Sequence, residues 1–266
     1  MKYYKLDKIF VTNTSYTAED DKLYIIQKIG TNVSDLYPTV AGQKIGKLDT
    51  DFAPLHKTSS NLLGPFDLKD LFIVVPPKKQ LKFESSSSGK VRAIGKIIEL
   101  EPGESIPNDL LARYNAHGKN YYTFEEGSNS LGTDEAMSAD QEVHLLTLDP
   151  TSIEKYVVDS IIMLSVSGGT VNEGDMALRL YYDDKPLDIL ESTMGKKGID
   201  SKSLPYPPAA STEEIPFTLA DMPIEVEPDH TLKFYVVNTS GSSLSPTSGS
   251  NWSWSLLVVY RRYQVA

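Results

Sequence analysis

The sequence predicts an all-β protein built from two similar halves, and three observations support this prediction. The first is an internal repeat: "PFDLKDLFIVVPPKKQLKF" (Pro65–Phe83) and "PFTLADMPIEVEPDHTLKF" (Pro216–Phe234) align without a gap. The second is a series of short β-branched and aromatic runs, separated by Gly, Ser, Pro and Asn, through most of the chain. The third is the scarcity of helical periodicity. Together they favour two β-rich units in tandem.

The repeat is too close to be a chance match. Its two 19-residue copies carry the same residue at 10 positions with a constant offset of 151 residues, whereas unrelated β segments of this length would share about one to three. Each copy predicts a strand (Phe72–Val75 or Pro223–Val226), a proline-containing turn, and the start of a further strand. We therefore expect Phe83 and Phe234 to be equivalent and buried. The matching pairs are Pro65/Pro216, Phe66/Phe217, Leu68/Leu219, Asp70/Asp221, Ile73/Ile224, Val75/Val226, Pro77/Pro228, Leu81/Leu232, Lys82/Lys233 and Phe83/Phe234.

Weaker similarities extend the two halves on either side of the repeat. Residues Tyr4–Ser15 align with Tyr156–Ser167, which suggests that both segments open their halves. The apolar strands predicted within Lys90–Leu100 and Asn251–Tyr263 close them. Two short helices are expected, at Pro107–Gly118 with Asn108 or Asp109 as its N-cap, and at Pro186–Gly195.

About eight strands in each half, joined by long connections, are typical of jelly rolls. We therefore predict an all-β fold of two tandem jelly-roll β-sandwiches related by an internal repeat, with few short helices. Residues 1–125 would form the first jelly roll, residues 126–150 a linker or loop, and residues 151–266 the second. An immunoglobulin-type sandwich is the alternative, although the cysteine-free chain lacks the Cys…Trp…Cys signature of antibody domains.

The composition of the chain argues against several classes of function. The chain has 26 basic and 36 acidic residues, a formal net charge of −10, and its basic residues cluster only in pairs, which argues against direct nucleic-acid binding. No apolar run approaches the roughly 18–20 residues of a transmembrane segment. The opening "MKYYKLDKIF" lacks the apolar core of a signal peptide.

Catalytic patterns are missing from the sequence. The four histidines, His56, His117, His144 and His230, show neither the His-x-His spacing of metal-dependent double jelly-roll enzymes nor a His-Glu-x-x-His motif. The serine-rich segments Ser85–Gly89 and Asn238–Ser250 lack the Gly-x-Ser-x-Gly nucleophile elbow. We therefore expect no catalytic residues, no bound cofactor and no enzymatic activity.

Two acidic clusters are candidate calcium-binding sites. Asp20 and Asp21 follow Glu19, and Asp183 and Asp184 lie in the turn "YYDDKP". Hydrated turns are one interpretation of these clusters. Weakly bound Ca²⁺ is the other, because this ion prefers carboxylate oxygens on loops.

The tryptophans and paired tyrosines also have two interpretations. Trp252 and Trp254 lie on one face of the last predicted strand, where they either pack in the core or form a platform for sugar rings. Tyr121 and Tyr122 are further candidates for stacking on a sugar.

In its organisation the chain resembles the major capsid proteins of the double jelly-roll lineage, found in tailless icosahedral viruses with an internal membrane. The two repeated stretches, set in two β-rich halves, carry this resemblance. The length suits the compact, corticovirus-like members. The resemblance implies a structural virion protein assembled in the host cytoplasm, forming pseudo-hexagonal homotrimeric capsomers that associate into a lattice. Its partners would be further copies, other virion proteins and an internal membrane.

Two other classes of function stay open. The first is a trimeric carbohydrate- or receptor-binding spike or fibre module, and the second is a glycan-processing enzyme. For a trimer, we expect the apolar irregular segments Leu36–Leu48 and Leu204–Phe217 to supply the contacts between chains.

Overall fold

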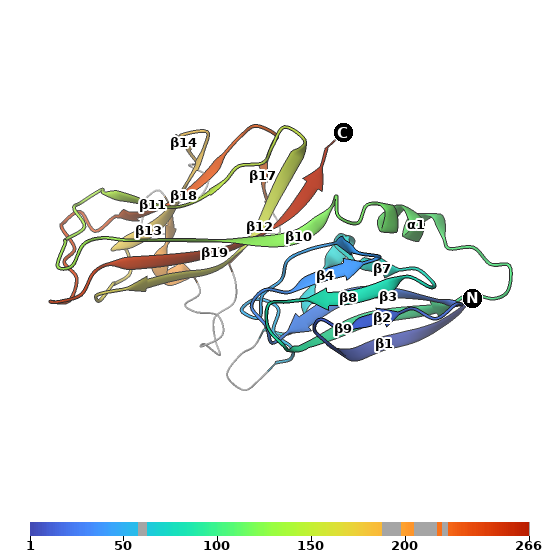
Figure 1. The fold of residues 1–266 in the computed structure, drawn as a ribbon. Helices are drawn as coiled ribbons and strands as arrows, with labels where there is room; N and C mark the ends of the chain where they lie inside the picture. The colour runs from blue at the N-terminus through green and yellow to red at the C-terminus, as the bar shows by residue number, and fades with distance from the viewer. Residues whose placement is uncertain (58–62, 188–197, 205–216, 220–222, 266) are drawn as a thin grey trace. The chain divides into compact units, whose positions relative to one another are not determined.

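A computed structural model describes residues 1–57, 63–187, 198–204, 217–219 and 223–265. The fold is all-β, as predicted (Figure 1). The chain divides into two compact units: residues 1–123 with 261–263 form the first, and residues 124–260 with 264–266 form the second. Among the described residues, no helix is long and apolar enough to cross a bilayer.

The first unit is a sandwich of two antiparallel sheets. One sheet has the order β1-β9-β3-β6, with β7 also paired to β3, and the other has the order β2-β8-β4-β5. The rings of Phe10 on β1 and Phe83 on β8 lie 5.3 Å apart, which joins the two sheets in one core. The strands are β1 (Lys2–Val11), β2 (Ser15–Thr17), β3 (Lys22–Thr31), β4 (Tyr37–Val40), β5 (Gln43–Lys44), β6 (Phe66–Asp67), β7 (Ile73–Val75), β8 (Gln80–Glu84) and β9 (Lys90–Glu99), with a 3₁₀ turn η1 (Lys69–Leu71).

The second unit repeats this architecture. Its sheets have the orders β10-β19-β12-β16, with β17 also paired to β12, and β11-β18-β13-β14, with β15 also paired to β13. Buried residues from both sheets, among them Leu178, Phe234 and Trp254, form a single core cluster. The elements are β10 (Tyr121–Ser130), β11 (Glu142–Leu148), β12 (Glu154–Ser167), β13 (Met176–Tyr182), β14 (Lys185–Pro186), β15 (Ile199–Asp200), η2 (Ser201–Ser203), β16 (Phe217–Thr218), β17 (Ile224–Val226), β18 (Leu232–Asn238) and β19 (Ser253–Gln264).

Both units have the strand order of a jelly roll. Counting β6 with β7 as one interrupted strand, the first, eighth, third and sixth strands form one sheet, and the second, seventh, fourth and fifth form the other. The same order holds in the second unit when β16 is counted with β17 and β14 with β15. The chain is therefore two tandem jelly-roll sandwiches.

The two repeated stretches occupy the same place in their sandwiches. Each contains the interrupted sixth strand, a turn, and the seventh strand in the opposite sheet. Phe83 and Phe234 both lie on the seventh strand and are fully buried. Their predicted equivalence is confirmed.

Backbone hydrogen bonds agree residue by residue within this region. The amide of Leu68 donates to the carbonyl of Gln27 at 2.9 Å, and the amide of Leu219 donates to that of Asp159 at 2.9 Å. In the following turn, Lys78 and Asp229 both adopt left-handed backbone, with φ of 63° and 61°. The two copies thus share hydrogen bonding and turn geometry as well as sequence.

The alignment of Tyr4–Ser15 with Tyr156–Ser167 was wrong. Tyr4–Ser15 covers most of β1, the first strand and a sheet edge, whereas Tyr156–Ser167 lies within β12, the third strand. The structural counterpart of β12 is β3, because Tyr24 and Tyr156 pair with Val75 and Val226 respectively. An edge strand and a central strand gave similar apolar patterns, and pattern alone did not distinguish them.

The segment expected to be a linker, residues 126–150, is part of the second sandwich instead. It contains most of β10 and all of β11. β10 contains small and polar residues that are typical of a loop. One of them, Gly127, is needed for close packing of the backbone, because a Cβ there would lie 2.4 Å from the carbonyl oxygen of Leu145. The second jelly roll therefore starts with β10 at Tyr121 and not at residue 151, and the boundary between the units falls at residues 123 and 124.

The longer predicted helix is present. α1 (Asn108–Asn115) begins after Pro107, which is its N-cap in place of Asn108 or Asp109. Leu110 packs against Leu23, Ile25, Val74 and Ile98, on the outer face of the sheet that contains β3 and β9. The second predicted helix, at Pro186–Gly195, falls mostly outside the described residues.

The apolar residues of Leu36–Leu48 do not form an exposed face. Leu36, Val40, Ile45 and Leu48 are at most 5% exposed and belong to the core of their own sandwich. The prediction that this segment supplies contacts between chains is therefore wrong, because its apolar side chains pack in the core of the first unit. Most of the corresponding segment, Leu204–Phe217, lies outside the described residues.

Removing either equivalent phenylalanine should destabilise the protein strongly. Phe83→Ala and Phe234→Ala each leave a cavity in a closed core, and each should lower the free energy of unfolding by about 3–5 kcal/mol. Urea unfolding measures this. The matched control is Tyr3→Ala, since Tyr3 is 65% exposed and its loss should change stability by about 0.5 kcal/mol or less. If the phenylalanine variants were no less stable than Tyr3→Ala, the assignment of the two cores would be wrong.

Candidate interaction surfaces

The predicted calcium ligands Asp183 and Asp184 form the hairpin between β13 and β14. Both have left-handed backbone, with φ of 47° and 65°, as a two-residue type I′ turn requires. Asp183 accepts a hydrogen bond from the amide of Thr231 at 2.8 Å and contacts His230. These hydrogen bonds, that of Thr231 first, lower the pKa of Asp183. Asp184 forms an ion pair with Lys233, at 2.6 Å.

The other acidic pair lies before β3. Asp20 forms an exposed ion pair with Lys78, at 3.2 Å, and the backbone carbonyl of Asp21 accepts a hydrogen bond from the amide of Leu100 at 2.8 Å. In the parts of the chain that the structure describes, no three His, Asp or Glu side chains lie close enough together to hold a metal ion. The structure thus brings protein cations and amides, instead of further carboxylates, to the predicted ligands.

His117 is the one strongly perturbed histidine among the described residues. It is 1% exposed, and its Nε2 accepts a hydrogen bond from the amide of Val74 at 3.2 Å. Burial, with a smaller contribution from Arg113, lowers the pKa of His117 to about 3. The ring is therefore neutral at physiological pH and serves to satisfy a buried amide. His230 lies in an exposed turn, as predicted, and His144 is exposed on β11.

The tryptophans belong to the core. Trp252 and Trp254 are 0% and 2% exposed, and the indole nitrogen of Trp252 donates to the carbonyl of Leu244 at 3.0 Å. Core packing is confirmed, and the alternative of a sugar platform at these two residues is wrong. Tyr122 is buried as well, at 2% exposed.

An exposed apolar surface lies on β1 and had no signal in the sequence beyond ordinary strand alternation. Among the described residues, five of the seven exposed large hydrophobic side chains come from the first eleven residues: Met1, Tyr3, Tyr4, Ile9 and Val11. Tyr3, Ile9 and Val11 lie on the side of β1 that faces away from the buried Leu6 and Phe10. Among the strands that the structure describes, β1 is the edge of its sheet and pairs only with β9. We call the outward side of β1 and β9 the β1 face.

Lysines border these apolar side chains. Lys5 lies directly opposite Lys96 across the β1–β9 pair, and both are exposed. Arg92 on β9 makes a two-pronged ion pair with Asp7, at 2.8 Å for each hydrogen bond, and these hydrogen bonds lower the pKa of Asp7. Because the charge of Asp7 is balanced by that of Arg92, the β1 face presents apolar side chains together with the basic charge of its lysines.

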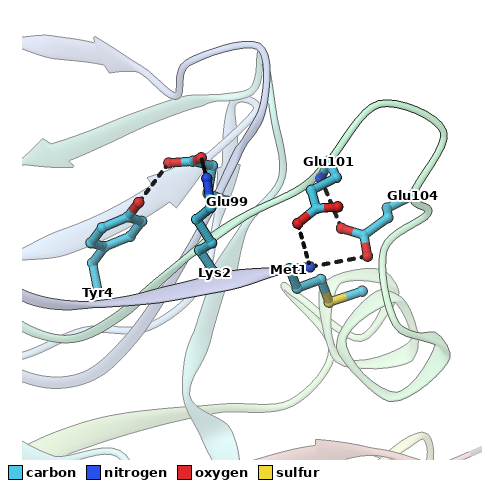
Figure 2. A network of polar contacts seen from close by, with 6 residues as sticks. All are labelled: Met1, Lys2, Tyr4, Glu99, Glu101 and Glu104. Atoms are coloured by element: carbon cyan, nitrogen blue, oxygen red, sulfur yellow. Dashed lines mark hydrogen bonds and ion pairs between the residues drawn. The ribbon is translucent and has the colours of Figure 1, made fainter.

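The beginning of β1 is fixed to the end of β9 by polar contacts, which Figure 2 shows. The amino group of Met1 lies 3.1 Å from Glu104 and 3.6 Å from Glu101. The hydroxyl of Tyr4 donates to Glu99 at 2.9 Å, and Lys2 approaches the same carboxylate at 3.4 Å. These contacts hold the β1 face in place although β1 is an edge strand.

An aromatic surface lies on the outer side of β11, β18 and β13 in the second unit. The ring of Tyr235 contacts His144 and Tyr181, with centroids 5.0 and 5.3 Å away. Arg179 lies over Tyr181, and both donate to Glu142, at 2.7 and 2.6 Å. We call this group the Tyr235 cluster.

The Tyr235 cluster borders a shallow groove of about 160 Å³ lined by Glu142, Tyr181, Asp184 and Tyr235. Burial first, and then Glu142, raise the pKa of Tyr181 to about 12, so the phenol stays a hydrogen-bond donor. The position equivalent to Tyr235 in the first unit is Glu84, which pairs with Lys82 at 3.1 Å. At this position the first unit thus has a charged side chain in place of the aromatic ring.

The two units have net charges of opposite sign. Residues 1–123 and 261–263 contain 19 Lys and Arg against 14 Asp and Glu, a net charge of +5, whereas the other residues contain 7 against 22, a net charge of −15. The repeated stretches show the same difference, since Lys78 in one corresponds to Asp229 in the other. Counting charges separately in the two halves of the sequence would have found this signal; the net charge of the whole chain concealed it.

Comparisons with known proteins leave the family open. No protein-family model matches the chain, and no curated protein matches it. Among solved structures, a chain from the structure of infectious bursal disease virus, Gt strain, aligns at 11% sequence identity with a TM-score of 0.22, covering 100% of this chain and 78% of that one. A TM-score this low carries no inference about fold or function.

Acid should destabilise the fold through His117. Below pH 6.5 the unfolded state binds a proton at this residue while the folded state does not until about pH 3. The free energy of unfolding should therefore be highest above pH 6.5 and fall by up to about 1.4 kcal/mol per pH unit below it. Urea unfolding across this range measures the slope, which His117→Gln should make shallower. An equal slope in both proteins would contradict the burial of a neutral imidazole.

Proposed function

We propose that this protein is a structural protein of a viral shell and that three copies form a pseudo-hexagonal homotrimeric capsomer. The observation that carries the proposal is the presence of two jelly rolls with the same strand order in one chain. Three such chains in a ring place six similar sandwiches around one axis, and a ring of that outline tiles a surface hexagonally. The different surfaces of the two units would then serve the non-identical contacts of the lattice.

The chemistry of the described residues supports a structural role. Jelly rolls occur in viral capsid proteins, in lectins and in cupins, and a cupin-like enzyme needs clustered metal ligands. In the described ranges, no such cluster is present. His117, the most perturbed histidine there, is buried against the Val74 amide, where no substrate would reach it.

The proposal includes the partners and the location that a shell protein requires. The main partner is the protein itself, first in the trimer and then in a lattice of trimers within the virion. Other virion proteins and an internal membrane are proposed as further partners, without direct contact to nucleic acid. No cofactor is proposed; calcium at Asp183 and Asp184, or at Asp20 and Asp21, would add to the stability of a loop and not to chemistry.

A trimeric carbohydrate- or receptor-binding module is the second candidate, and the Tyr235 cluster favours it. Partly exposed aromatic rings beside carboxylates are suited to stacking and hydrogen bonding with sugars, and in the first unit Glu84 occupies the position of Tyr235. A glycan array separates the two candidates. Binding that Tyr235→Ala abolishes would support the module, and a negative array is expected of a shell protein.

The trimer is tested by light scattering coupled to size exclusion. The shell proposal predicts a mass about three times that of the 29.5 kDa chain, because shell interfaces bury on the order of 2,000 Å² and persist at micromolar concentration. A monomer under all conditions would contradict the proposal.

A further inference from the structure

The division of charge between the two jelly rolls points to a specific mode of association between copies. The first unit has a net charge of +5 and the second of −15. Two copies that meet first unit to first unit, or second to second, place like charges together, which is unfavourable at close range. Contact between the first unit of one copy and the second unit of another brings opposite charges together. The chain therefore carries its own complementary surface.

The edge strands carry this difference in charge. β1 and β10 are the first strands of their jelly rolls, and among the described strands each is the edge of its sheet. β1 carries Lys2, Lys5 and Lys8 against Asp7, and β10 carries Glu125 and Glu126, both exposed and without a lysine or arginine on the same strand. Two strands in equivalent positions thus have opposite charge.

The β1 face has a second property of a docking surface. Its exposed apolar side chains Tyr3, Ile9 and Val11 are 65%, 49% and 49% exposed, and they lie beside Lys5 and Lys96. Apolar groups bordered by charged ones are the usual composition of a protein interface, with apolar contact providing affinity and charge providing orientation. An edge strand left open in this way also has unpaired backbone groups available to a partner.

We propose that the β1 face of one copy, with Lys5 and Lys96, docks on the acidic second jelly roll of another copy along its edge strand β10, which carries Glu125 and Glu126. The contact is head to tail, so it repeats from copy to copy and closes into a ring when the rotation allows. This inference rests on the proposed function only because it requires copies of the chain to associate. It adds which surfaces meet and that electrostatic attraction orients them. The association is electrostatic in orientation and should weaken as salt increases.

Charge exchange in the full-length chain tests the contact. Lys5→Glu with Lys96→Glu should weaken self-association by about tenfold or more at low salt, since it places like charges opposite each other. Glu125→Lys with Glu126→Lys should do the same. The chain that carries all four substitutions should associate again, because the attraction is restored with its direction reversed. Sedimentation equilibrium measures each association constant, and circular dichroism confirms that each variant is folded.

The matched control changes the same net charge elsewhere. Lys79→Glu with Lys119→Glu replaces two exposed lysines of the first unit that lie on neither β1 nor β9, so it alters the charge of that unit as Lys5→Glu with Lys96→Glu does, but not the β1 face. It should leave association close to that of the unmodified chain, and a loss equal to that of the β1 variant would overturn the inference.

The remaining outcomes separate this inference from the proposed function. Trimers that neither salt nor any charge exchange weakens would overturn the inference and leave the shell proposal standing. Salt-sensitive dimers or open chains, rescued by the fourfold exchange, would support the inference and contradict the trimeric shell. Binding of the chain to vesicles of phosphatidylcholine with phosphatidylserine, without self-association, would overturn the inference in favour of a membrane-binding β1 face.

Discussion

The crossing from one sheet to the other is the constraint on which each sandwich depends. A sheet with one apolar face is stable only when a second sheet covers that face. The segment from the sixth to the seventh strand makes this crossing, so its residues must pack on the same core from both sides. Lys78 and Asp229 adopt the same left-handed turn there, and Phe83 and Phe234 end the crossing fully buried. This explains why the sequence similarity of the halves is greatest in this segment.

The sequence was sufficient to predict the β class, the two sandwiches, and the burial of Phe83 and Phe234, because these follow from local alternation and from the repeat. It was not sufficient to place β10 or β12 in the second sandwich. Their positions depend on pairing with β19, which is distant in the sequence. β10 in particular ends in small polar residues that resemble a loop until a partner strand supplies its hydrogen bonds.

The interaction surfaces were less predictable for a similar reason. The opposition of Lys5 and Lys96 is set by strand register, and the Tyr235 cluster joins side chains from three strands. Neither follows from neighbouring letters in the sequence. The two units kept the buried residues of the crossing and diverged at exposed or partly exposed positions, where Glu84 corresponds to Tyr235 and Lys78 to Asp229. Divergence at such surface positions is what a duplicated unit would show when each copy acquires its own contacts.

Electron microscopy of the purified chain at high concentration decides whether the protein builds a shell. We predict flat hexagonal arrays or closed shells at low ionic strength, with a repeating unit of near sixfold outline made from three chains. Isolated monomers at the same concentration, at low and at high ionic strength, would contradict a role in a shell.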